Sequence, residues 1–236
     1  MRILVATAVP PERDAVARAF ADPADEVPLP GATLHRIRGW DLLAAGVGPA
    51  RAAACTAGAL TAAALSGSPY GLVVCAGIAG GFAPEAPVGS LVVADDITVA
   101  DLGADTADGF VPVTALGFGT VSHRPPNALV RDVAAATGAR AGAVLTVSTV
   151  TGTAERAAEL RARHPLALAE AMEGFGVAEA AAAHGVPVVE LRAVSNPVGP
   201  RDRAAWRIGE AFAALTEAFG KLPPVLESWN PHEPPH

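Results

Sequence analysis

Short apolar runs alternate with segments of helical composition along most of this chain. The runs RILVATA (residues 2–8) and LVVCA (72–76) are typical of buried strands, whereas residues 49–65 are alanine-rich and have the length of a helix. Buried strands need helices to cover them, and strands that alternate with helices pair mainly in parallel. The alternation therefore predicts a layered α/β fold, mostly parallel, in one domain. We expect this domain to span residues 1–222, followed by a proline-rich tail over residues 223–236.

The same patterns place the remaining elements. We expect further strands over residues 41–46, 90–99, 143–148 and 186–194, and further helices over residues 12–20, 127–137, 154–163 and 206–219. The hydroxyls of Thr151 and Thr153 can cap the helix that begins at residue 154. Residues 100–119 form a polar, glycine-containing loop and are a candidate lid.

Composition narrows the range of functions. The net charge is -7 without a basic cluster, which argues against nucleic acid as a partner because phosphate binding needs a positive face. No apolar stretch is long enough to cross a membrane, and Cys55 and Cys75 fit neither a disulfide framework nor a metal site. We therefore expect a cytoplasmic protein with two buried thiols, no metal, no membrane partner and a small-molecule substrate. Because only 17% of the residues are charged, we expect part of the surface to be hidden in an oligomer.

Residues 168–183 (LALAEAMEGFGVAEAA) are predicted to form one helix, because they are rich in alanine and nearly free of β-branched residues. On this helix Glu173 would lie on a stripe of small apolar residues, where an unpaired carboxylate is costly and needs a partner, a shifted pKa or a ligand. The alternative is that Glu173 lies at the edge of the stripe and reaches water. Glu170 and Glu179 are interpreted as solvent-facing charges.

Two glycine-rich segments follow predicted strands. Residues 46–48 (GVG) lack the third glycine and the downstream acid of a dinucleotide site, so no nicotinamide cofactor is expected. Residues 77–81 (GIAGG) are interpreted as a turn whose small residues let a ligand approach the backbone, although glycines more often serve only to make tight turns. Glu12 follows the first strand, at the sheet edge where α/β proteins collect ligands. Its alternative role is to complement a helix dipole.

Four segments together resemble one family. Glu12 follows the first strand, residues 77–81 follow the third, Met172-Glu173 lies within AMEG, and residues 192–196 begin the segment RAVSNPVGP. In this order they resemble the nucleoside phosphorylase superfamily over roughly residues 2–218, and within it the nucleosidase branch of the methylthioadenosine nucleosidases and futalosine hydrolases, with the futalosine hydrolases closest. The resemblance implies a three-layer α/β/α domain with a central mixed, mostly parallel sheet. It also implies a homodimer or a larger homo-oligomer without a cofactor.

The resemblance also implies roles for individual residues. Glu173 would accept hydrogen bonds from the ribose 2′- and 3′-hydroxyls and stabilise a cationic sugar, while Met172 would pack beneath the sugar. Glu12 would activate the attacking water and Arg192 would help to hold it. The remaining substrate-binding positions that the resemblance implies are Ile78, Ala79, Gly80, Thr151 and Gly152. A serine of the methylthioadenosine branch is replaced by Ile78 here, so the third group on the water is open.

Asn196 is the most informative departure from that branch, which has an aspartate at this position. An amide can donate to a 6-oxo group while its carbonyl accepts from N7, which favours hypoxanthine over adenine. Hydrolysis is favoured over phosphorolysis, because the phosphate-binding segment of the hexameric phosphorylases is missing after the first strand and Glu12 would repel phosphate. Together with these preferences, the resemblance implies cleavage of futalosine to hypoxanthine and dehypoxanthinyl futalosine in menaquinone biosynthesis. The alternatives are another purine nucleosidase, a purine nucleoside phosphorylase, and an inactive nucleoside-binding module.

Overall fold

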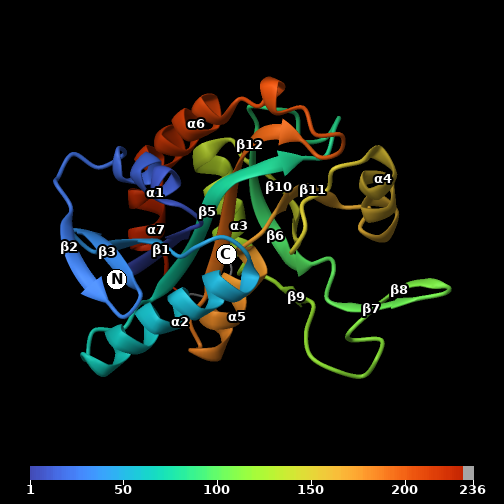
Figure 1. Ribbon diagram of the computed structural model, residues 1–236. Helices are drawn as coiled ribbons and strands as arrows, with labels where there is room; N and C mark the ends of the chain where they lie inside the picture. Colours follow the sequence, from blue (N-terminus) through green and yellow to red (C-terminus); the bar gives the residue numbers. More distant parts are fainter. Residues whose placement is uncertain (231–236) are drawn as a thin grey trace.

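The computed structural model describes residues 1–230 and consists of helices packed on both faces of a large sheet (Figure 1). The strands are β1 (Ile3–Thr7), β2 (Asp25–Leu29), β3 (Ala32–Ile37), β4 (Trp40–Ala44), β5 (Leu72–Gly81), β6 (Leu91–Val99), β7 (Gly103–Thr106), β8 (Gly109–Pro112), β9 (Ser122–His123), β10 (Arg140–Thr146), β11 (Ala167–Ala171) and β12 (Val188–Pro197). The helices are α1 (Pro10–Ala17), α2 (Pro49–Leu65), α3 (Asn127–Thr137), α4 (Ala154–Arg163), α5 (Gly174–Ala183), α6 (Ile208–Lys221) and α7 (Pro223–Ser228), with a short 3-10 turn η1 (Arg203–Ala205).

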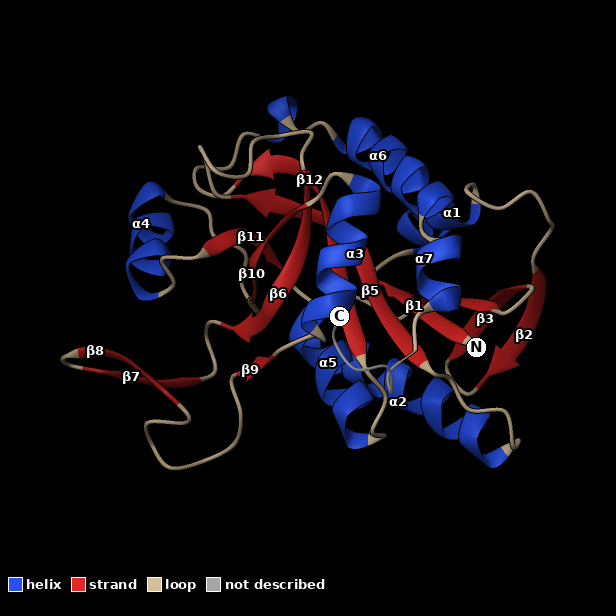
Figure 2. Ribbon diagram, turned by 180° about the vertical axis from the view of Figure 1, so that it is seen from behind, coloured by secondary structure: helices blue, strands red, loops and turns tan. Residues whose placement is uncertain are grey.

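The helices form two layers that are separated by the sheet. Apolar residues of α2 and α5, among them Ala59 and Val177, pack on one face. Residues of α1, α3, α6 and α7, such as Leu129 and Leu215, pack on the other face, as the front and back views show (Figures 1 and 2). The predicted three-layer α/β/α architecture is thus confirmed.

The sheet is mixed and has the order β11-β10-β6-β12-β5-β1-β4-β3-β2. Strands β12, β5, β1 and β4 pair in parallel, as do β6, β10 and β11, whereas β12 meets β6 antiparallel. The far strand β11 also pairs with the end of β5, so the sheet curves back on itself. This curvature brings the carboxyl ends of β1, β5, β11 and β12 together.

Several predicted elements have the expected bounds. α3 and α4 cover residues 127–137 and 154–163 as predicted, and α2 covers residues 49–65. The Thr153 hydroxyl caps α4 by accepting from the Arg156 backbone N–H at 3.1 Å. α1 begins at Pro10, two residues before the predicted start, so Pro10 and Pro11 form its first turn.

The prediction of one helix over residues 168–183 is wrong. Residues 167–171 form the buried strand β11, and α5 begins only at Gly174, so Glu173 lies in the turn between them. Glu170, interpreted as a solvent-facing charge, is buried on β11, whereas Glu179 is exposed as expected. Alanine favours helix only weakly, and pairing of β11 with two strands overrides that preference.

The glycine-rich segment 77–81 is not a turn, because β5 continues through it as a strand. Residues 100–119 contain the β7–β8 hairpin, which projects from the body of the molecule (Figure 1). Residues 223–228 form α7 and bury Leu226, so the first residues of the predicted tail belong to the packed domain. The tail residues 231–236 lie outside the described part. None of the helices within residues 1–230 combines the length and the apolar character needed to cross a membrane.

Candidate active site

A cavity of about 530 Å³ lies at the carboxyl ends of β1, β5, β11 and β12. Eight of the ten residues predicted for the site line it: Glu12, Ile78, Ala79, Gly80, Thr151, Met172, Glu173 and Asn196. Arg192 is fully buried beneath this cavity, and Gly152 is not among the lining residues. These residues come from five segments of the chain, which only the sheet brings together.

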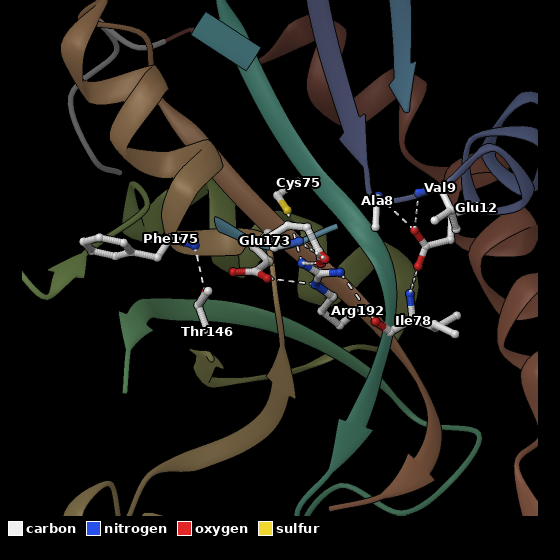
Figure 3. Close-up of polar contacts among 11 residues, drawn as sticks. Ala8, Val9, Glu12, Cys75, Ile78, Thr146, Glu173, Phe175 and Arg192 are labelled. Atoms are coloured by element: carbon white, nitrogen blue, oxygen red, sulfur yellow. Dashed lines mark hydrogen bonds and ion pairs between the residues drawn. The ribbon is translucent and has the colours of Figure 1, made fainter. Parts of the chain in front are cut away.

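Glu12 is held by the backbone around it (Figure 3). One carboxylate oxygen accepts from the N–H groups of Ala8 and Val9 at 2.9 and 3.2 Å, and the other accepts from Ile78 N–H at 2.9 Å. Burial raises the pKa of Glu12 above its ordinary value, although the Arg192 charge and the Ile78 hydrogen bond oppose the rise. A buried carboxylate with a raised pKa at the end of β1 is suited to accept a proton.

Arg192 connects the carboxylates on the other side of the cavity. Its Nε donates to Glu190 at 2.8 Å and its Nη2 donates to Glu173 at 3.3 Å, as Figure 3 shows for Glu173. The second oxygen of Glu173 accepts from Gly48 N–H at 3.3 Å. Arg192 Nη1 also faces Glu12, because a Cβ added to Gly77 would lie 2.7 Å both from this atom and from Glu12 Oε1. One guanidinium therefore orients the two acids with assigned roles.

Sequence reasoning missed Glu190, whose side chain is completely buried on β12. Burial raises the pKa of Glu190, against the effect of the neighbouring Arg192. An acid and an arginine two positions apart in the apolar run VPVVELRAV lie on the same face of a strand, and this spacing was the available signal.

Asn196 and Glu170 lie on either side of Gly80. In the sheet register Gly80 pairs with Asn196 of β12 and with Glu170 of β11. Asn196 Oδ1 accepts from the Ser195 hydroxyl at 2.8 Å, which fixes the amide so that its NH₂ group donates, here to Pro197 O at 3.0 Å. Glu170 accepts from the backbone N–H and the hydroxyl of Thr151 at 2.8 and 2.5 Å. Burial raises the pKa of Glu170.

The remaining predictions concern aromatic residues and metals. None of the phenylalanines Phe82, Phe110 and Phe118 lines the cavity. Trp206, Arg201 and Arg203 line it instead. Within residues 1–230 no three histidine, cysteine or acidic side chains are grouped to hold a metal ion. Cys55 and Cys75 are buried free thiols, as expected.

Comparisons with known proteins agree with this arrangement. A family model described as the phosphorylase superfamily matches residues 2–223. The chain is 80% identical to a futalosine hydrolase of Streptomyces coelicolor, over 99% of this chain and 100% of the relative. It is 46% identical to a futalosine hydrolase of Acidothermus cellulolyticus, over 93% of this chain and 89% of the relative.

Two solved structures have the same fold. The native futalosine hydrolase of Helicobacter pylori gives a TM-score of 0.78 at 18% identity, over 94% of this chain and 97% of that one. A 5′-methylthioadenosine/S-adenosylhomocysteine nucleosidase of Neisseria meningitidis gives 0.78 at 21% identity, with the same coverage. On the strength of the family match and of its curated relatives, this chain belongs to the phosphorylase superfamily and, within it, to the futalosine hydrolases.

Proposed function

We propose that this protein hydrolyses the N-glycosidic bond of futalosine and releases hypoxanthine and dehypoxanthinyl futalosine, a step of menaquinone biosynthesis. One observation carries the proposal: buried Glu12 and Glu173 face a single cavity from opposite sides of Arg192. Cleavage of the bond places positive charge on the ribose and negative charge on the base, and a site of this kind has groups for both.

The ribose is assigned to Glu173. Each of its oxygens has one donor in the protein, Gly48 N–H or Arg192 Nη2, and each keeps a lone pair for a 2′- or 3′-hydroxyl of the sugar. The negative charge of Glu173 stabilises the cationic sugar as the bond breaks. Met172, which lines the cavity beside it, packs against the sugar ring.

The attacking water is assigned to Glu12, with Arg192 as the second group that holds it. The water oxygen bonds to C1′ and its proton passes to the Glu12 carboxylate, while the electron pair of the C1′–N9 bond leaves with the purine. Ile78 stands where the methylthioadenosine branch has a serine. Its side chain has no polar group for the water, and its backbone N–H already donates to Glu12. Glu12 would repel a phosphate nucleophile, so the site favours water.

The base is assigned to Asn196 and Glu170, with Ala79, Gly80 and Thr151 around it. The Asn196 NH₂ donates to the 6-oxo group, and Glu170 accepts from the N1–H that hypoxanthine has and adenine lacks. Both residues pair with Gly80, from the strands on its two sides. Gly152 lies next to Thr151 but does not line the cavity, and a Cβ there would make an ordinary van der Waals contact with the stem of Arg201, at 3.5 Å.

Assembly and location complete the proposal. We infer a homodimer or a larger homo-oligomer, supported by the low content of charged residues and by the exposed apolar side chains Val47 and Phe118. A cytoplasmic location is supported by the two free thiols, since reducing compartments keep cysteines unpaired.

A direct assay tests the reaction. The protein is incubated with futalosine, inosine or methylthioadenosine, with and without phosphate, and the released bases are separated by chromatography. We expect hypoxanthine from futalosine at a rate that does not depend on phosphate. Strict phosphate dependence would indicate a phosphorylase, preference for methylthioadenosine would indicate the other nucleosidase, and tight purine binding without turnover would indicate an inactive binding module.

A further inference from the structure

Two charged residues and one aromatic residue of the segment between β12 and α6 line the cavity but have no role in the reaction as described. They are Arg201, Arg203 and Trp206, which lie on or next to the turn η1. Both guanidinium groups lie over the Trp206 ring, with their carbon atoms 5.4 and 5.8 Å from the ring centre. The indole ring thus holds two cations together on one side of the cavity.

Among the described residues, no acid neutralises the two arginines. Within residues 1–230 neither Arg201 nor Arg203 forms an ion pair, whereas Arg192 is paired with Glu190 and Glu173. Asp202 lies between them in sequence, but its carboxylate accepts from the Ala204 N–H at 3.1 Å and caps η1. Two exposed guanidinium groups, without an ion pair in the described part of the chain, therefore face the cavity from one segment.

The charge of the cavity is divided between its two ends. Buried Glu12, Glu170 and Glu173 make the sheet end acidic, and each of them is assigned to the water, the base or the ribose. A carboxylate on the substrate would be repelled from that end and attracted to the arginines. Guanidinium groups are the protein groups whose geometry matches a carboxylate best, because they donate two parallel hydrogen bonds.

We propose that Arg201, Arg203 and Trp206 form a subsite for an aryl carboxylate at the 5′ end of the nucleoside. The inference rests on the proposed function, because futalosine carries an aromatic carboxylate at that end. The arginines donate charge-assisted hydrogen bonds to the carboxylate, and Trp206 gives the aromatic ring an apolar wall. The subsite separates futalosine from nucleosides that share its base and ribose but have no acid.

The test compares two substrates that differ only in this charge, futalosine and its methyl ester. For the wild-type protein we expect kcat/KM to be at least tenfold higher for the acid. In Arg201→Met and Arg203→Met, which keep an apolar stem but lose the charge, we expect this ratio to fall at least threefold each. In the double variant it should approach one, mainly through a higher KM for futalosine. Arg203→Lys should retain part of the ratio.

Arg207→Met provides the matched control. Arg207 is an exposed arginine next to the same segment, but it pairs with Glu210 and does not line the cavity. We expect Arg207→Met to keep the wild-type ratio. If the wild-type protein cleaves futalosine and the double variant keeps the wild-type ratio, the subsite is wrong while the proposed function stands. If the wild-type protein releases no hypoxanthine from futalosine, the proposed function itself fails.

Discussion

Two opposing effects act on the pKa of Glu12. Three backbone N–H groups and the nearby Arg192 favour its charged form, whereas burial favours its neutral form and prevails, so that the pKa is raised. A base with a raised pKa takes a proton from water more readily than an ordinary carboxylate does, but it becomes protonated at a higher pH. If Glu12 is the base, as proposed, we expect the pH dependence of the reaction to report on this residue.

We predict that kcat/KM for futalosine falls as the pH drops through the raised pKa of Glu12, so that the acid limb lies above the ordinary carboxyl value of 4.5. Glu12→Gln cannot accept the proton and should lower kcat by about 100- to 10,000-fold. Its residual activity should lose the acid limb. Hypoxanthine release measured between pH 4 and 9 tests both points. An unchanged acid limb in the variant would assign the base to another residue.

A second prediction concerns the base preference, which we assign to Asn196 and Glu170. Asn196→Asp replaces a donor with a carboxylate that repels the 6-oxo group, and Glu170→Gln weakens the acceptor for N1–H. We expect each variant to lower the ratio of kcat/KM for inosine to that for adenosine at least tenfold, because a mismatched base edge leaves buried polar groups unpaired. Glu179→Gln, at an exposed acid paired with His123, is the control. A ratio that stays constant in both variants would mean that neither residue reads the base.

The β11–α5 segment shows what local sequence could and could not predict. Residues 168–183 are alanine-rich throughout, and composition alone does not separate a buried strand from a helix in such a stretch. Glu173 was singled out on the expectation of a helical stripe, and that expectation is wrong because Glu173 stands in a turn. Glu170 was missed because its neighbour across the sheet is 90 residues away, at Gly80. Motifs located the candidate site, and strand pairing shows which further residues lie beside it.

The end of β5 illustrates a different limit. Its glycines were predicted to form a turn, yet they lie in a strand where neighbouring groups leave no room for side chains. A Cβ on Gly81 would come within 2.1 Å of Ala86 O, and one on Gly77 would collide with Arg192 and Glu12. Glycine in a strand often marks such a close approach. The need for glycine arises from contacts with residues far away in the sequence. The sequence therefore shows the glycines but not the contacts that require them.

Gly77→Ala should therefore displace the side chains that pack against β5 in the candidate site. The added methyl group must displace the buried, hydrogen-bonded ends of Glu12 and Arg192, so we expect kcat to fall at least tenfold, with a stability loss of about 1–3 kcal/mol. The control is Gly58→Ala on α2, where an added Cβ meets nothing within 4 Å. It should stabilise the protein by about 0.5–1 kcal/mol without changing kcat. Equal kinetics in the two variants would show that Gly77 does not position the site.

The carboxyl ends and the amino ends of the central strands differ in what they hold. The cavity lies at the carboxyl ends of the strands, whereas a network of charges lies at the amino ends of β1, β4 and β5. There, buried Asp41 accepts from Arg36 at 2.8 and 3.1 Å, from the Tyr70 hydroxyl at 2.6 Å, and from Arg2. Although burial alone would raise the pKa of Asp41, these hydrogen bonds lower it below its ordinary value. This network ties strands together far from the chemistry.

Asp41→Asn should consequently lower stability and spare catalysis. We expect the free energy of unfolding to fall by about 1–3 kcal/mol at pH 7, because several donors lose a charged acceptor. A lowered pKa stabilises the fold above the unfolded value of about 3.8, and that contribution disappears as the pH falls through the folded pKa. The difference between wild type and variant should therefore shrink below about pH 4.

The control is Asp14→Asn, at a half-exposed acid, which should change stability little. Denaturant titrations at pH 7 and pH 3, together with KM for futalosine, measure these quantities; a variant that raises KM at unchanged stability would place Asp41 in the site and not in the scaffold.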